Sequence, residues 1–144
     1  MKKANVRLMS ADLKRVVVLA ADEAVKRQHN SLNHEHFLLA ILMTDNPDTS
    51  KWLFNENLDP GMLKNAVQME LSTWHDDRSV IEITDEHNNV DLPFSKEMAS
   101  IFTDELSGSR DRLTSPLDIL IRMLQAPTES IEKVLAELRR DAKG

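Results

Sequence analysis

The same order of helical segments occurs twice in this 144-residue chain, and this repetition limits the folds open to it. In each half, a helical pattern leads through a polar break into a second, leucine-led helix, a short break and a further apolar stretch. Leu32 aligns with Leu113, and Ser10 aligns with Ser95. The serines lie farther apart than the leucines, so we expect the first helix of the second half to be about one turn shorter.

Composition favours helices in both halves. The chain contains only 3 Gly and 5 Pro and lacks Tyr, while 41% of its residues are hydrophobic. Few turn-forming residues disfavour a β protein, and the plentiful Ala, Leu, Glu and Met are good helix formers. The predicted fold class is therefore all-α.

Apolar periodicity and helix caps locate the individual helices. A first stripe runs from Leu13 to Ala24 behind a Ser10 cap, and Asn33 caps a second helix that is apolar on most faces and so should be buried. A third helix holds residues 52–54, and Asp59-Pro60 opens a fourth. Further helical patterns cover residues 93–106, 113–124 and 130–140.

A polar, acidic segment separates the two halves. We place repeat one at about residues 8–72, the connector at about 73–92 and repeat two at about 93–141. A short β-like alternation at Val80, Ile81 and Ile83 leaves room for an extended piece within the connector. A loop of this length is uncommon inside a compact unit, so we interpret it as a link between two packed helical units.

Charge and cysteine content exclude several function classes. The net charge is −6 without a basic stripe, which disfavours nucleic-acid binding, and the chain has no Cys for disulfides or cysteine-based zinc sites. No apolar run reaches the ~18 residues of a membrane span, and the N-terminus lacks the apolar core of a signal peptide. We expect a cytoplasmic protein with no cofactor.

The segment His34-Glu35-His36 is the first candidate for metal or acid–base chemistry. On a helix, however, the two histidines would point about 200° apart, whereas a helical zinc pair is spaced i, i+4. In the second half, the position of Glu35 is Pro116, which follows Ser115 as a first helical residue follows its cap. We therefore interpret the segment as the first turn of a buried helix, with Glu35 at the positive end of the helix dipole and His36 half-buried.

A metal-dependent hydrolase built on these histidines remains an alternative function. It would require His29, His75 or His87, which lie in breaks or in the connector, to converge on the same site. It predicts that replacing His34 or His36 by Ala removes an activity without unfolding the chain.

The doubled unit, with Glu35-His36-Phe37-Leu38-Leu39-Ala40-Ile41-Leu42 opening a second helix, resembles the N-terminal domain of the Clp ATPases, the AAA+ unfoldases and disaggregases. The segment from Leu113 to Leu117 is similar to the diverged second copies of that family. The resemblance covers about residues 8–140. It implies a pseudo-twofold domain of two four-helix repeats, flexibly attached to an ATPase ring. The chain has no G-x-x-x-x-G-K-[ST] phosphate loop, so ATP hydrolysis would be absent or reside on another polypeptide.

The resemblance also implies a non-catalytic role. Such domains dock adaptor proteins, or unfolded or tagged substrates, for the parent AAA+ ring, and they need neither nucleic acid nor membrane. We expect the isolated domain to be a monomer. A stand-alone adaptor or decoy for a Clp machine is the alternative within the same fold.

Five residues are candidates for partner binding. Some family members bind phosphorylated arginine through a hydroxyl at the start of the first helix and the glutamate of the second, which matches Ser10 with Glu35 here. Ser95 would pair with Pro116, so the second copy lacks the carboxylate; both serines also fit as plain helix caps. Trp52 and Phe54 could anchor a partner, although Trp52 also fits the core of repeat one.

Overall fold

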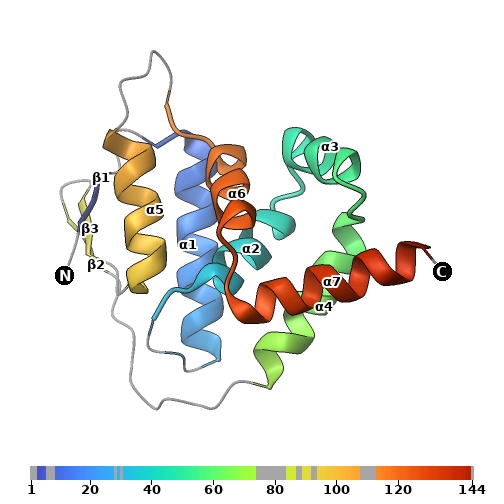
Figure 1. The fold of residues 1–144 in the computed structure, drawn as a ribbon. Helices are drawn as coiled ribbons and strands as arrows, with labels where there is room; N and C mark the ends of the chain where they lie inside the picture. The colour runs from blue at the N-terminus through green and yellow to red at the C-terminus, as the bar shows by residue number, and fades with distance from the viewer. Residues whose placement is uncertain are drawn as a thin grey trace.

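The computed structural model describes residues 3–5, 9–27, 29, 31–73, 84–86, 89–91, 94–107 and 113–143. These residues form a helical protein with one very small sheet (Figure 1). The helices are α1 (Ala11–Lys26), α2 (His34–Met43), α3 (Pro47–Asn55), α4 (Pro60–Ser72), α5 (Lys96–Ser107), α6 (Pro116–Gln125) and α7 (Glu129–Lys143). The prediction of a helical fold class is confirmed.

The helices begin where the sequence placed their caps. The Ser10 side chain accepts a hydrogen bond from the Leu13 amide at 3.1 Å, and the Ser95 side chain accepts one from the Met98 amide at 3.2 Å. Pro60 and Pro116 each stand at the start of a helix, where no amide hydrogen is needed. Helix α5 has 12 residues and α1 has 16, so the expected one-turn difference is present.

Three strands of three residues each are present, where the sequence allowed for only one short extended piece in the connector. They are β1 (Lys3–Asn5), β2 (Thr84–Glu86) and β3 (Asn89–Asp91), and they pair antiparallel in the order β1–β3–β2. Strands this short carry too few side chains to produce a recognisable alternation. Strands β2 and β3 fall inside the predicted connector at 73–92, whereas Val80, Ile81, Ile83 and most of that connector lie outside the described residues.

Helix α2 is the centre of the core. It contacts α1, α3, α4 and α6, and every residue from His34 to Ile41 is buried, as predicted for this helix. An aromatic trio connects it to α5: the ring centroids of Phe37, Phe94 and Phe102 lie 4.9–5.4 Å apart. Trp52 is half-buried against the same core.

The second half contains three helices among its described residues, which corrects the expectation of four in each half. Where the first half has α3 and α4, the second has α7, a single helix of 15 residues that packs on α4. The reason lies in its sequence: the buried stripe of Ile131, Val134 and Leu135 continues with no proline or capping residue to divide it.

Candidate functional site

The first turn of α2 connects three parts of the molecule. His34, Glu35 and His36 are each at most 2% exposed; the first two bind residues between α6 and the start of α7, and His36 binds the segment between α1 and α2. The His34 ring donates from Nε2 to the Ala126 carbonyl at 3.2 Å, just before α7. Burial lowers the pKa of His34, although Glu35, the Ala126 carbonyl and Glu97 act in the opposite direction.

Glu35 fixes the start of α7 to the start of α2. Its Oε2 accepts hydrogen bonds from the Thr128 hydroxyl, at 2.6 Å, and from the Ser130 hydroxyl. The Thr128 oxygen in turn accepts from the Ile131 amide at 3.4 Å, so it also caps α7. The Glu35 carboxylate therefore holds the first turn of α2 against the start of α7.

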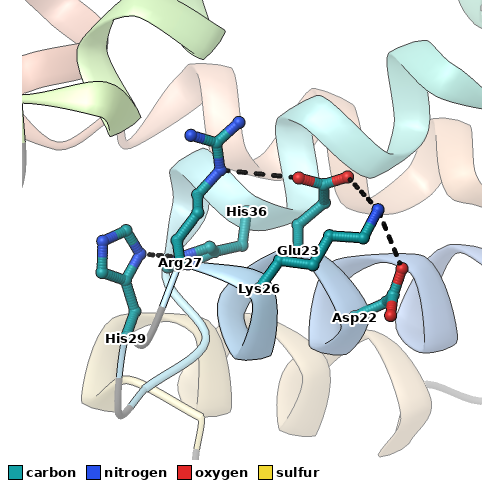
Figure 2. Close-up of polar contacts among 6 residues, drawn as sticks. All are labelled: Asp22, Glu23, Lys26, Arg27, His29 and His36. Carbon is teal, nitrogen blue, oxygen red and sulfur yellow. Dashed lines mark hydrogen bonds and ion pairs between the residues drawn. The ribbon is translucent and has the colours of Figure 1, made fainter. Parts of the chain in front are cut away.

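His36 is fully buried, not half-buried as expected, because it bridges two backbone segments. Its Nδ1 accepts the Asn33 amide hydrogen at 3.0 Å, and its Nε2 lies 2.8 Å from Nδ1 of His29. His29 is itself buried, in the segment between α1 and α2 (Figure 2). Burial, the neighbouring His29 and Arg27 together lower the pKa of His36 to about 3, and burial contributes most.

A small charge network lies beside the two imidazoles on the last turns of α1. Figure 2 shows Glu23 between two cations: its carboxylate oxygens lie 3.5 Å from Arg27 Nε and 3.7 Å from Lys26 Nζ. Lys26 also pairs with the exposed Asp22 at 3.4 Å. Glu23 is buried, so its charge is balanced by these two cations rather than by water.

The structure brings His29 to His36 but separates His34 from that pair. His34 faces Ala126 and His36 faces His29, so the two rings bind different segments. Within the described ranges, no group of three or more His, Cys, Asp or Glu side chains could hold a metal ion. His75 and His87 lie outside those ranges.

The five residues predicted for partner binding occupy different environments. Ser10 and Ser95 cap α1 and α5, Glu35 is buried and bonded to α7, and Trp52 lies half in the core. Phe54 on α3 is 59% exposed and is thus the one of these five that offers a large apolar surface to solvent. In the part of the chain described, no hydrogen bond, ion pair or ring contact joins any two of the five.

A cavity of about 330 Å³ lies between the end of α2 and the starts of α3 and α4. Its wall is apolar on the α2 side and carries hydroxyl and charged groups elsewhere; the lining residues are Ile41, Leu42, Met43, Asp45, Thr49, Ser50, Pro60, Gly61 and Lys64. A space of this size fits one side chain of a partner or a small amphipathic molecule. The sequence did not indicate that these residues line a common space.

The sequence did not identify Thr128 and Ser130 as partners of Glu35. His29 was considered only as a metal ligand, and its contact with His36 was not predicted. Thr128 had a weak signal, since it precedes the apolar stripe of α7 at a capping position. The Glu35 partners follow it by more than ninety residues, so only the assembled fold reveals them.

No protein-family model matches this chain, and a search of curated proteins also found no match. Among the helices that the structure describes, none has the length and apolar character needed to cross a membrane.

Proposed function

We propose that this chain is a non-catalytic docking domain that recruits adaptor proteins or unfolded substrates to a Clp-type AAA+ unfoldase, and that it is built from a duplicated helical unit. The observation that supports this most strongly is a reciprocal pair of contacts between helix starts. The proposal places the protein in the cytoplasm, where such a motor would meet its substrates.

Two contacts join the halves in the same way, and the second repeats the first with the roles of the two halves exchanged. Met9 forms a parallel bridge with Thr114, and Leu32 forms a parallel bridge with Phe94. In the first, the Ser10 amide donates to the Thr114 carbonyl at 2.8 Å; in the second, the Ser95 amide donates to the Leu32 carbonyl at 2.8 Å. Each bond joins the first helix of one half to the second helix of the other, as a pseudo-twofold arrangement requires.

Burial along α2 and α6 supports the same relationship. When the caps Asn33 and Ser115 are matched, the register shifts by one residue from the leucine alignment. Three buried positions of each helix then coincide: Phe37, Leu38 and Ile41 with Ile119, Leu120 and Met123. Under this proposal, the acidic segment at about 73–92 is the link between the two copies.

A docking role needs surface that the core does not use. Large apolar side chains are exposed on α3 and α4, at Phe54, Met62 and Met69. Methionine adapts to irregular partner surfaces, and an exposed phenylalanine can supply a buried anchor. Holding a substrate here would raise its effective concentration at the pore of the motor.

Affinity capture with quantitative mass spectrometry tests this function. The 144-residue chain is the bait, Phe54→Glu is the test variant, and Val18→Glu is the matched control, because Val18 is similarly exposed at 64% but lies on α1. We expect a defined adaptor or substrate set that Phe54→Glu loses and Val18→Glu keeps. Recovery of an intact AAA+ ring would favour the stand-alone adaptor instead, and equal recovery with all three baits would contradict docking through Phe54.

A further inference from the structure

The buried pair His29–His36 has no part in the proposed docking function. The two rings meet edge to face, with centroids 5.0 Å apart and planes inclined by 63°. His29 is positioned by its backbone, whose amide donates to the Ala24 carbonyl at the end of α1 at 2.9 Å. His36 belongs to the first turn of α2, so the pair joins two consecutive helices.

The hydrogen bonds determine where the protons lie. His36 Nδ1 accepts from the Asn33 amide, which can only donate, so this nitrogen carries a lone pair. In the neutral ring the proton is then on Nε2, which donates to His29 Nδ1 across 2.8 Å. His29 Nδ1 must therefore also be unprotonated. Both contacts exist together only while both rings are neutral.

The surrounding charges oppose protonation. Both Arg27 and His29 disfavour the imidazolium form of His36. On the α1 side, the Glu23 carboxylate, which could have stabilised a positive ring, is paired with Arg27 and Lys26 (Figure 2). Glu97 of α5 and Glu35 of α2 act on His34 rather than on this pair.

We propose that the His29–His36 pair is a proton-sensitive lock, which holds the first turn of α2 against α1 while both rings are neutral and releases it when either ring takes up a proton. A proton on His36 Nδ1 would face the Asn33 amide hydrogen and break that bond. A proton on His29 Nδ1 would place two N–H groups head to head across the 2.8 Å contact.

Loss of the His29–His36 contact would also affect other helices, because residues at the start of α2 form hydrogen bonds to the starts of α5 and α7. Glu35 holds Thr128 and Ser130 at the start of α7, and the Leu32 carbonyl accepts the Ser95 amide at the start of α5. Loosening the turn therefore weakens the contacts of α2 with both α5 and α7. Acidification would therefore loosen the packing of the first turn of α2 against its neighbouring helices.

Amide hydrogen exchange at pH 7.5 and pH 5.0 tests the lock, with a control inside the same molecule. The Asn33 amide donates to His36 Nδ1 at the start of α2, and the Ser115 amide donates to Asp118 at the start of α6. Corrected for the intrinsic exchange rates, the protection of Asn33 relative to Ser115 should fall about thirtyfold or more at the lower pH. An unchanged ratio would overturn the proposal.

Two variants assign the effect to a ring. His36→Gln removes the ring that accepts the Asn33 amide and with it the contact between the two imidazoles, whereas His34→Gln removes a buried histidine of the same turn that faces Ala126 instead. The fall in relative protection should be small in His36→Gln and should persist in His34→Gln. An equal fall in the two variants, or a smaller one in His34→Gln, would overturn the assignment.

If His36→Gln does not fold, the wild-type chain still decides the matter through a second pair of amides. Protection of the Ser95 amide, bonded to Leu32 next to the lock, is compared with that of the Ser10 amide, bonded to Thr114 far from it. Selective loss at Ser95 at pH 5.0 supports the lock. Parallel loss at both sites would show general acid unfolding and overturn it.

Discussion

The starts of α2 and α6 both contain a capping box, but the two are built differently. At α6, the Ser115 amide donates to the Asp118 carboxylate at 2.9 Å, and the Asp118 amide donates back to the Ser115 hydroxyl at 3.4 Å. This capping box closes within four residues. At α2, an imidazole replaces the carboxylate and extends to His29, while Glu35 extends to α7.

The first turn of a helix can thus be stabilised by residues close to it in the sequence or by residues from other helices. Helix α6 begins with groups that its own sequence supplies, so its start should tolerate changes elsewhere in the fold. Helix α2 begins with buried groups whose partners come from the end of α1 and the start of α7. Its stability should therefore depend on distant residues and on pH, and the following predictions test this contrast in order of decreasing effect.

Replacing Glu35 by Ala should have the largest effect. The variant removes a charged acceptor from two half-buried hydroxyl groups, and hydrogen bonds to charged groups contribute about 1.5–3 kcal/mol each. We expect the free energy of unfolding, measured in urea, to fall by about 3 kcal/mol.

Asp118→Ala is the matched variant at α6 and should cost about 1 kcal/mol, the usual effect of losing a cap interaction. Equal losses for Glu35→Ala and Asp118→Ala would mean that the two helix starts do not differ in their dependence on the rest of the fold.

Lowering the pH should have the next largest effect. The folded pKa of His36, about 3, is below the unfolded value of 6.5, so between these values the unfolded chain binds more protons. Stability from this residue is thus complete above pH 6.5 and is lost as the pH falls towards 3. At pH 5.0 the free energy of unfolding should be about 2 kcal/mol lower than at pH 7.5.

Urea unfolding curves of the wild-type chain and His36→Gln at both pH values provide the check. The variant should be less stable than wild type at pH 7.5, because it lacks the imidazole bond to Asn33, but its stability should change less on acidification. If the two chains lose the same free energy between pH 7.5 and 5.0, His36 does not cause the loss.

Ser115→Ala should cost about 1 kcal/mol and should leave the pH dependence of stability unchanged between pH 7.5 and 5.0. The same cost is expected for Ser10→Ala, because that serine also caps a helix through one amide bond. Denaturation at the two pH values measures both quantities. A Ser115→Ala variant with altered pH dependence would mean that the α6 start is coupled to the histidine pair.

Phe54→Glu should have the smallest effect on folding. The side chain is 59% exposed, and substitutions at such surface positions usually change stability by less than about 0.5 kcal/mol. Thermal unfolding measures this change, and it also shows whether any loss of partner binding by this variant reflects the surface rather than the fold. A loss above about 2 kcal/mol would place Phe54 in the core instead.

Much of the fold was predictable because its signals are local. The stripe behind Ser10, the Asp59-Pro60 and Ser115-Pro116 helix starts, and the uniformly apolar α2 each lie within a few residues. Each appears in the structure at the expected place. The repetition of the pattern also predicted the shorter α5.

The candidate site was less predictable because its contacts are long-range. The motif His34-Glu35-His36 identified a helix start, but nothing in the sequence indicates that His29 approaches His36 or that Thr128 and Ser130 reach Glu35. Strand β1 was not predictable for a related reason, since it forms by pairing with β3, which is distant in the sequence. The direction of each buried polar side chain is decided only when the helices pack.

The most direct test of the account is the nitrogen NMR spectrum of the histidine rings in the folded 144-residue chain at pH 7.5 and pH 5.5. We expect His36 to be neutral at both values, with its proton on Nε2 and a lone pair on Nδ1. A His36 ring that carries its proton on Nδ1, or that titrates in the folded chain near 6.5, would contradict a start of α2 held by neutral imidazoles.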